Sequence, residues 1–283
     1  MALVFSPADF TSGLERTEAK LTFNGLTLND RYLADTYFVS EIDWGDPDIR
    51  DSKMPIPGTH GEFIGKQFFG GRTMTLSGYI RAGNRAMLRK MENDLRAALA
   101  SNLEHDLFIT GMTAALLRIS CRKASSLALK PSNRGMYFCT DFQFSLRASD
   151  PRFRAYTPSN TSITFSAGGT GTCTNGGNWW AEPVLRLGNA ATSVTDPVVV
   201  NSTLNLTLAF TGVITGNATT WTELGLRAVD RYCVDQAGAV QWAKVDPASA
   251  FWALQPGVNN ITVNRSAQTG SPTVSITWYD SWI

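Results

Sequence analysis

The stretch 68–100 changes its hydrophobic period once, and this change constrains the fold more than any other feature of the sequence. Between residues 72 and 81 apolar and polar side chains alternate, as in a strand with one buried face. Asn84 is a candidate N-cap, and over residues 85–100 apolar residues recur three and four positions apart, which predicts an amphipathic helix. The side chains predicted to face the core are Met74, Leu76 and Ile80 from the strand and Leu88, Met91 and Leu95 from the helix. No other segment shows the helical period, so we expect a mainly β protein with one helix packed against a sheet.

The segments before the helix predict short antiparallel strands. KLTFNGLTL (20–28) forms two strands about an Asn-Gly turn, which is a strong hairpin signal. A further strand is expected over 37–44, and the Pro- and Gly-rich segment 53–61 is expected to be a loop. We expect segments 62–69 and 72–81 to form a hairpin about Gly70-Gly71.

The segments after the helix return to the strand period. Strands are predicted over 107–109 and 114–121, and 136–146 shows the longest alternation in the chain. Its predicted apolar face consists of Met136, Phe138, Phe142, Phe144 and Leu146. The strand is expected to end before Pro151, because proline cannot donate to a sheet.

The composition changes after Pro151. Residues 157–178 are rich in Ser, Thr, Gly and Asn, with one short strand over 163–165, and are expected to lie outside both cores. Short strands separated by turn signals then predict a second all-β sandwich or jelly roll; they lie at 183–187, 204–210, 221–229, 258–263 and 274–279. We therefore predict a helix-bearing antiparallel β-sandwich over residues 1–155, followed by a second β-sandwich over residues 156–283.

The charge content excludes several classes of function. The net charge is +1 and no Lys/Arg stripe is present, which argues against sequence-specific nucleic-acid binding. The first ten residues, MALVFSPADF, lack the charged start and long apolar run of a signal peptide, so we expect synthesis in a cytosol. No apolar segment approaches the ~20 residues that span a bilayer, so no membrane insertion is expected.

The polar residues do not predict a catalytic site. The acidic segment Glu41–Asp51 lacks the ligand spacing of a calcium loop, and Glu182 and Glu223 have no evident pairing for a glycosidase. The only histidines, His60 and His105, accompany no nucleophile motif. The cysteines, expected to be buried and reduced, are Cys121, Cys139, Cys173 and Cys233. We therefore predict no catalytic, cofactor-binding or metal-ligating residue.

Seven of the eight tryptophans lie beyond residue 178, and they allow one alternative function. Aromatic faces suit pyranose rings, so some of these side chains could form a sugar-stacking platform, although tryptophan is usually largely buried. The residues concerned are Trp179, Trp180, Trp221, Trp242, Trp252, Trp278 and Trp282. The alternative hypothesis is a carbohydrate-binding β-sandwich protein.

Several residue strings, taken in order, resemble the distal tail proteins (Dit) of long-tailed bacteriophages. In the first half they are the strand ending at Ile42-Asp43-Trp44, the Pro-Gly loop, GRTMTLSG (71–78) and FSLRASDP (144–151). In the second half they are GNW (177–179), PVL (183–185), LQPGVNNI (254–261) and the ending WYDSW (278–282). The likeness covers most of the chain, and its specificity comes from the order of the strings.

This resemblance implies a structural role. Distal tail proteins form a ring, usually hexameric, that joins the tail tube to the tail-tip or baseplate proteins and lets DNA pass. The resemblance implies that residues 1–155 build the ring and that residues 156–283 form a galectin-like sandwich. The partners implied are further copies of the chain, the tail tube protein, and tail-tip hub and receptor-binding proteins. The implied location is the distal end of the phage tail in the virion.

Overall fold

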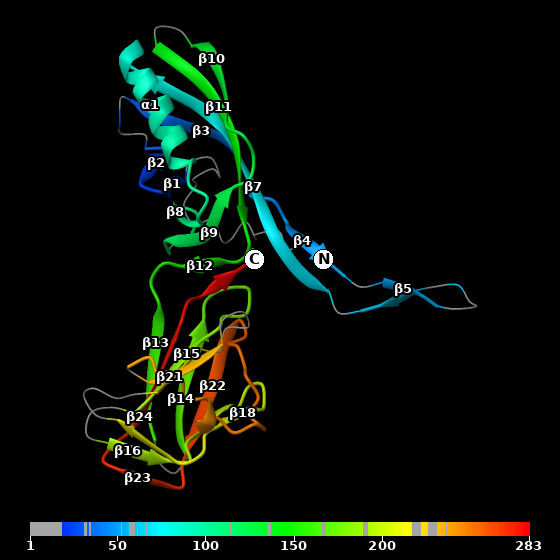
Figure 1. The fold of residues 1–283 in the computed structure, drawn as a ribbon, viewed down its shortest axis with the longest axis vertical. Coiled ribbons are helices and arrows are strands. Elements are labelled where there is room, and N and C mark those ends of the chain that lie inside the picture. Colours follow the sequence, from blue (N-terminus) through cyan, green and yellow to red (C-terminus); the bar gives the residue numbers. More distant parts are fainter. Residues whose placement is uncertain are drawn as a thin grey trace. The chain divides into compact units, whose positions relative to one another are not determined.

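The chain divides into two compact units in a computed structural model (Figure 1). Unit 1 comprises Met1–Tyr156 with Ile283, and unit 2 comprises Thr157–Trp282. The structure describes residues 19–30, 33, 35–51, 53–56, 60, 62–65, 67–113, 115–134, 137–165, 168–188, 192–216, 222–225, 231–235 and 237–283. These residues form antiparallel sheets and a single α-helix, which lies in unit 1. The predicted fold class, a helix-bearing β structure followed by an all-β sandwich, is confirmed.

The main sheet of unit 1 follows the strand order β2-β1-β8-β9-β11-β7-β3. These strands are β1 (Lys20–Phe23), β2 (Leu26–Leu28), β3 (Thr36–Asp43), β7 (Phe68–Ala82), β8 (His105–Thr110), β9 (Leu117–Lys123) and β11 (Tyr137–Ala148). Three short strands extend it, namely β4 (Pro47–Arg50) on β7, β10 (Ala128–Arg134) on β11 and β12 (Phe153–Ala155) on β9. A separate two-stranded sheet consists of β5 (Lys53–Pro55) and β6 (Glu62–Ile64). The predicted Asn24-Gly25 hairpin turn is confirmed between β1 and β2, with φ of 45° and 78° at the two residues.

The centre of unit 1 is the long antiparallel pair β7–β11. The two strands are in register from Arg72↔Ala148 to Ala82↔Phe138. Buried and half-exposed residues alternate along β7, as the sequence predicts, and the same alternation continues on β11. The buried side chains of this pair include Met74, Leu76, Ile80, Phe142, Phe144 and Leu146. Each buried side chain of this size stabilises the fold by about 1.5–3 kcal/mol.

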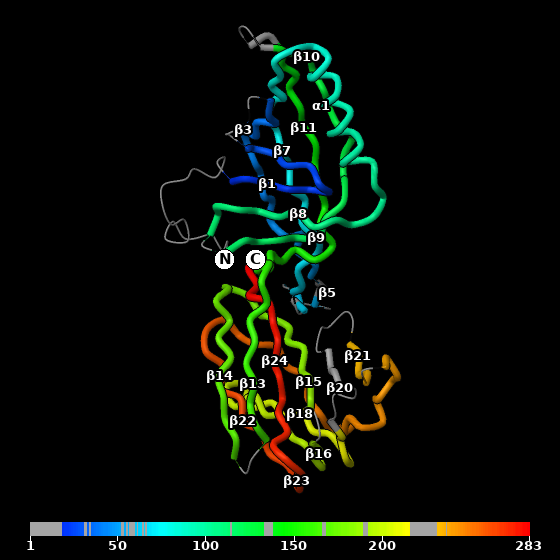
Figure 2. Tube along the Cα trace, turned by 90° about the vertical axis from the view of Figure 1, so that its left-hand side faces the viewer, coloured from blue at the N-terminus to red at the C-terminus, as the bar shows by residue number. Residues whose placement is uncertain are grey.

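The helix α1 (Arg85–Ala98) packs its apolar face on β7, β11 and β2. Figure 2 shows it lying alongside the β10–β11 region. Asn84 is the N-cap, as predicted, because its Oδ1 accepts a hydrogen bond of 2.8 Å from the Met87 amide. The helix ends two residues earlier than predicted, at Ala98, and the buried residues include Met91 and Leu95, while Leu88 is only half-buried.

Polar contacts fix the position of α1 on the sheet. The Tyr37 hydroxyl donates to the Met91 carbonyl at 2.9 Å, and Thr140 Oγ1 donates to Glu92 at 2.6 Å. Burial, together with the charge of Asp94, raises the pKa of the Tyr37 phenol, so its proton stays available for this bond. These bonds join β3 and β11, on either side of Ile80 in β7, to two adjacent residues of the helix.

Two predictions for the region before α1 are wrong. The expected hairpin about Gly70-Gly71 does not form, because β7 continues through both glycines. A Cβ at Gly71 would lie 2.7 Å from the Ala148 carbonyl oxygen, so glycine here permits close approach of β11 and marks no turn. The expected loop 53–61 contains β5, in which Met54 pairs with Phe63 of β6. Residues 57–59 and 61 of that loop lie outside the described residues.

The predicted apolar face of 136–146 needs a smaller correction. Phe138 is 43% exposed, although Phe142, Phe144 and Leu146 are buried as expected. Met136 lies outside the described residues. The sequence did not predict β10 or β12; β10 contains Pro131 and pairs with β11, consistent with an edge position.

Unit 2 consists of three sheets around one apolar core, and Figure 2 shows β13, β24 and β15 side by side. The first has the order β13 (Ser159–Thr164), β24 (Thr273–Trp278), β15 (Val184–Leu187), β20 (Thr222–Gly225), β21 (Tyr232–Asp235). The second has the order β14 (Gly169–Asn175), β22 (Gly257–Asn264), β17 (Val198–Asn201), β18 (Leu206–Ala209). The third has the order β19 (Val213–Gly216), β16 (Thr192–Thr195), β23 (Ala267–Thr269). The 3₁₀ helix η3 (Trp242–Lys244) and β25 (Ser281–Trp282) complete the unit.

The stretch 157–178 belongs to the core of unit 2, so the prediction that it lies outside both cores is wrong. It supplies β13 and β14. Ile163, Phe165 and Cys173 are buried in the same cluster as Leu185, Val263 and Ile276. The predicted strand 221–229 is represented by β20, and the remainder of it lies outside the described residues.

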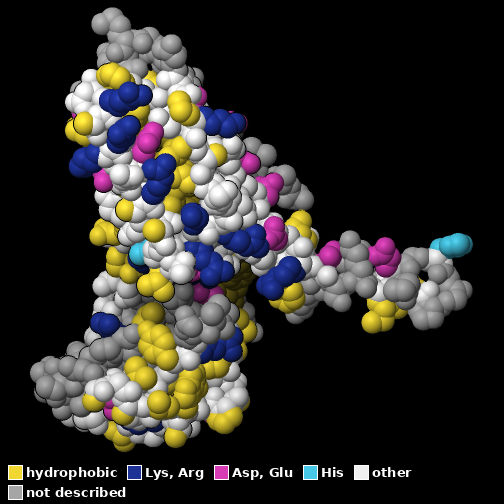
Figure 3. Space-filling view, turned by 45° about the horizontal axis from the view of Figure 1, so that its top comes forward, with side chains coloured by type: hydrophobic (Ala, Val, Ile, Leu, Met, Phe, Trp, Pro, Cys, Tyr) yellow, Lys and Arg dark blue, Asp and Glu magenta, His cyan; other side chains and the backbone are white. Residues whose placement is uncertain are grey.

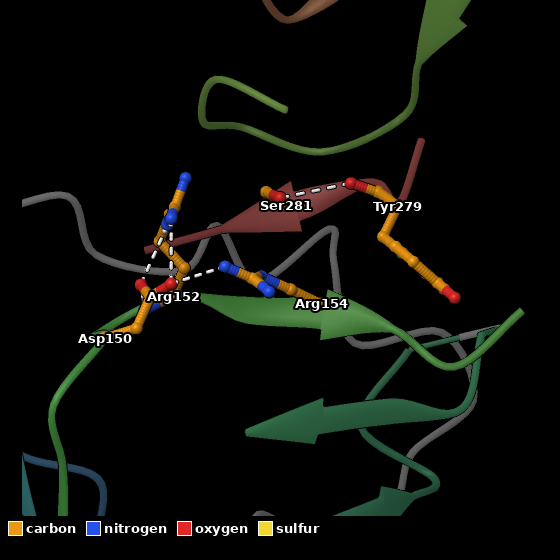
Figure 4. Close-up of polar contacts among 5 residues, drawn as sticks. All are labelled: Asp150, Arg152, Arg154, Tyr279 and Ser281. Carbon is orange, nitrogen blue, oxygen red and sulfur yellow. Dashed lines mark hydrogen bonds and ion pairs between the residues drawn. The ribbon is translucent and has the colours of Figure 1, made fainter. Parts of the chain in front are cut away.

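The end of unit 1 is fixed by an ionic cluster that follows β11 (Figure 4). Asp150 accepts hydrogen bonds from Arg152 Nε and Nη2, both at 2.8 Å, and also from Arg154. Burial alone would raise the pKa of Asp150, but the hydrogen bonds and charges of the two arginines outweigh it and lower the pKa. Figure 4 also shows a contact within unit 2, in which the Ser281 hydroxyl donates to the Tyr279 carbonyl at 3.1 Å.

Candidate assembly surface

The carboxylates of the acidic segment that the sequence singled out have separate hydrogen-bond partners. Asp43 accepts a hydrogen bond of 2.9 Å from the Gly45 amide, and Asp48 pairs with Arg147 at 2.5 Å. Glu41 accepts a bond of 3.4 Å from Ser77. The carboxylates are thus distributed along β3 and β4. Within the described part of the chain, no group of three or more His, Cys, Asp or Glu residues could hold a metal ion.

The other residues that the sequence analysis considered for catalysis lie on different elements of the structure. His105 contacts the Ser101 hydroxyl at 2.7 Å and lies edge-on to Phe23, whereas His60 is exposed near the β5–β6 hairpin. Glu182 follows the Ala181–Leu254 bridge, and Glu223 lies in β20. The four cysteines are buried and none of them is in a disulfide, and burial raises the pKa of Cys173 and Cys233 to about 11. Buried thiols with raised pKa values are poor nucleophiles.

The tryptophans of unit 2 divide by exposure. Trp252 and Trp278 are core residues, each 3% exposed. Trp179 and Trp282 are half-buried, and Trp221 lies outside the described residues. Only Trp180 and Trp242, at 39% and 38%, count as exposed among those that the structure describes.

A surface that the sequence did not reveal lies on β4, β5, β6 and the first residues of β7. We call the described residues within 47–69 the arm. Figure 1 shows β4 and β5 leading away from the sheet that carries α1. The arm starts as the β4–β7 pair, with Ile49 opposite Phe69, and continues as the β5–β6 hairpin.

The arm consists of paired strands and exposes large apolar side chains. Ile49, Met54, Phe63 and Phe68 are 59%, 64%, 61% and 60% exposed. An isolated two-stranded hairpin is marginally stable in water, and clustered exposed apolar residues mark interaction sites. Figure 3 shows hydrophobic side chains along this projection. The arm is therefore suited to bury its side chains against another molecule.

The base of the arm is anchored by charged side chains. Arg147 of β11 donates to Asp48 of β4 and to Thr73 Oγ1 at 3.0 Å. Arg72 is buried with its guanidinium 4.7 Å from the centroid of the Phe153 ring. Burial lowers the pKa of Arg72 to about 10, although the charge of Asp46 opposes this. A pKa of about 10 still leaves the guanidinium charged at neutral pH.

Comparison with known proteins identifies likeness in fold but not in sequence. No protein-family model matches the chain. No curated protein sequence matches it either.

No helix among the described residues is long and apolar enough to cross a membrane.

Several solved structures resemble the chain. The SPP1 Dit (gp 19.1) protein is similar over 94% of this chain and 99% of that chain, with a TM-score of 0.68 and 16% identity. A chain of the phage P2 baseplate in its activated conformation with Ca matches over 92% and 97%, with a TM-score of 0.45 and 7% identity. The cap of the anti-feeding prophage matches over 53% and 95%, with a TM-score of 0.30 and 15% identity.

The superposition on SPP1 Dit extends through both units and leaves almost none of that protein unmatched. The resemblance to distal tail proteins that the sequence strings indicated is confirmed at the level of the fold. The chain has the fold of the SPP1 distal tail protein.

Proposed function

We propose that this protein is a structural subunit of a phage tail tip, and that copies of it assemble into a hexameric ring. The observation that carries the proposal is the match in fold with SPP1 Dit over 94% of the chain. That protein is described as a paradigm of the hub adsorption apparatus in phages that infect Gram-positive bacteria. The proposed role is mechanical and assigns no catalytic activity to the chain.

The arm supports the assembly part of the proposal. A ring is built from heterologous contacts, in which one surface of a subunit meets a different surface of the next. The arm offers such a surface, because its exposed Met54, Phe63 and Phe68 have no core of their own to enter. In the proposed ring these side chains lie against the neighbouring copy.

The remaining parts of the proposal concern partners and place. The ring would join the tail tube to the tail-tip hub and receptor-binding proteins at the distal end of the tail, and DNA would pass through it. We assign the ring contacts to residues 1–155 and an outward position to residues 156–283. The β-strand content of both segments, with an extended arm on the first, is compatible with this division.

The assembly proposal can be tested with arm variants. Light scattering coupled to size exclusion and negative-stain imaging would measure the size and symmetry of the purified chain over a range of concentrations. We expect rings for the unmodified chain at high concentration. The triple variant Met54→Ser, Phe63→Ser, Phe68→Ser is expected to remain monomeric, because it removes the apolar contacts but no buried core residue.

The matched control is Leu103→Ser, which changes an apolar side chain of unit 1 that is 72% exposed but lies outside the arm. It should assemble like the unmodified chain. The proposal is contradicted if the unmodified chain stays monomeric at all concentrations and with tail proteins present. It is equally contradicted if the arm variant forms normal rings.

A further inference from the structure

We propose that the arm of one copy docks on a second surface of unit 1 in the neighbouring copy, formed by Phe38, Tyr79 and Arg81. We call these three residues the aromatic patch. The inference rests on the proposed ring and deepens it, because it names the surface that receives the arm.

The aromatic patch lies on the face of the sheet opposite to α1. Tyr37 of β3 is buried, and its hydroxyl donates to the Met91 carbonyl of α1, so the next residue, Phe38, points to the other face. Tyr79 of β7 is the cross-strand partner of Phe38. Both side chains are half-buried, so part of each ring faces solvent.

The two rings form one flat surface between charged side chains. The Phe38 and Tyr79 ring centroids lie 5.2 Å apart at an interplanar angle of 6°. Arg81, the next outward position of β7, has its Cζ 5.9 Å from the Phe38 ring centroid. Asp141 of β11 is the cross-strand partner of Tyr79 and shares its face. An aromatic centre with a polar rim is the usual composition of a protein interface.

The arm carries side chains that suit this surface. Met54 of β5 and Phe63 of β6 are cross-strand partners, and both are exposed. Aromatic and thioether side chains pack favourably on aromatic rings. Glu62, beside Phe63, is also exposed, so the arm offers a carboxylate next to its apolar pair, as the aromatic patch offers the Arg81 guanidinium next to its rings.

The arm of a chain does not reach the aromatic patch of the same chain. β7 connects the two surfaces, and from Phe68 to Tyr79 it spans about 36 Å at about 3.3 Å per residue. β4 pairs with the start of β7, and Figure 1 shows β4 and β5 leading away from the sheet. The occupant of the aromatic patch is therefore the arm of another copy. Such a contact joins two different surfaces, which is the kind that closes a ring.

The ring pair of Phe108 and Tyr156 is the rival acceptor in unit 1. Its centroids lie 5.5 Å apart at 79°, so the two rings share no flat surface. Tyr156 follows β12, whose Phe153 contacts Arg72 near the base of the arm. The rival pair thus lies at the end of the sheet from which the arm departs, whereas the aromatic patch lies further along β7.

The test mixes two variants of the full-length chain, each with one of the two surfaces removed. The arm variant is Met54→Ser, Phe63→Ser, Phe68→Ser, and the patch variant is Phe38→Ser, Tyr79→Ser. Light scattering should report a monomer for each alone, with association weakened about tenfold or more relative to the unmodified chain. Their equimolar mixture should form a dimer with one copy of each, because the patch variant supplies the intact arm and the arm variant supplies the intact patch. Tyr156→Ser is the matched control and should form rings.

Cross-linking keeps the test valid if the patch variant fails to fold. Ser40→Cys, two residues from Phe38, and Met54→Cys change exposed positions, and the four native cysteines are buried. In a mixture of the two single variants, a short bis-maleimide should join one copy to the other. The yield should be about tenfold or more above that of Met54→Cys mixed with Leu103→Cys, whose exposed site lies outside the aromatic patch.

The outcomes separate this inference from the proposed ring. Rings from the unmodified chain together with rings from a folded patch variant would overturn the docking site and leave the ring in place. Loss of rings in Tyr156→Ser, or equal cross-linking to Leu103→Cys, would also overturn it. An unmodified chain that never associates would overturn the ring and the docking site together.

Discussion

At the scale of single residues, the glycines of β7 decide how closely the strands of unit 1 approach. A Cβ at Gly78 would lie 1.9 Å from the Phe38 carbonyl oxygen of β3, a distance that no side chain tolerates. Gly78 faces Val39 in the pairing, beside the register shift between Val39 and Glu41. The irregular edge of the sheet therefore depends on the absence of a side chain at one position.

We expect Gly78→Ala to destabilise unit 1 by at least about 2 kcal/mol, because β3 must move away from β7. Thermal unfolding followed by circular dichroism measures the effect. Ser77→Ala, at the adjacent half-exposed position, serves as the control and should change stability by no more than about 0.5 kcal/mol. Equal melting temperatures for both variants would show that β3 does not pack as described.

The Asp150 cluster predicts a pH-dependent contribution at the residue scale. The pKa of Asp150 is lowered in the folded protein, so its carboxylate stabilises the fold above the ordinary pKa of about 3.9. Asp150→Asn is expected to cost about 1–2 kcal/mol near neutral pH, a value reduced for partial exposure. The difference between the two proteins should vanish as the pH falls from about 4 through the lowered pKa. A difference that stays constant down to pH 2 would contradict the assignment.

At the scale of elements, α1 packs against the sheet of unit 1 through one face, and its other face is exposed. Leu95 is 1% exposed and Met91 is 5% exposed, whereas Arg85 and Arg89 face solvent. The helix therefore draws most of its stability from packing, because an isolated helix of this length is marginal in water.

Leu95→Ala is expected to lower the free energy of unfolding by about 2–5 kcal/mol, through lost burial and the cavity left behind. Denaturant unfolding of the full chain measures it. Arg89→Ala on the exposed face of the same helix should have an effect within about 0.5 kcal/mol. An unchanged midpoint for Leu95→Ala would mean that α1 does not pack on the sheet.

The elements that the sequence predicts are those with one buried and one exposed face. β7, β11 and α1 have such faces, so the hydrophobic period gave their type and approximate bounds. The arm shows no buried side chain among its described residues, and its Met54 and Phe63 occur among prolines and glycines that suggest a loop. The assembly surface was missed for that reason.

β14 was missed for a different physical reason. Its inward positions include Asn175, a buried polar residue whose Nδ2 donates to the carbonyls of Trp179 and Leu254. A hydrogen-bonded asparagine in the core breaks the apolar pattern without breaking the strand. For the tryptophans of unit 2, the sequence did not indicate which are exposed; among those that the structure describes, Trp180 and Trp242 are exposed and Trp252 and Trp278 are buried.

At the scale of the whole molecule, the chain has two units with separate cores and a short connection. Tyr156 belongs to unit 1, where its amide donates to the Leu116 carbonyl at 2.7 Å and its ring packs against Phe108. β13 of unit 2 begins at Ser159, which leaves Thr157 and Pro158 between them. We expect each unit to fold alone.

A fragment of residues 1–156 should form rings, and a fragment of residues 157–283 should be a folded monomer. The first keeps Tyr156 because of its contacts with unit 1. Light scattering measures the assembly state, and circular dichroism confirms folding. A folded first fragment that stays monomeric, together with a second that forms the ring, would reverse the proposed assignment of the ring contacts.

β7 is a single strand of 15 residues, about 50 Å long, that belongs both to the arm and to the sheet behind it. It is hydrogen-bonded to β4, β3 and β11 along this length. Because these bonds lie across the strand, a pull along the arm would load many of them in shear together, and would not unzip them one at a time. The arm is thus built to transmit tension into the body of unit 1, and a docked arm would act as a tether of high mechanical strength.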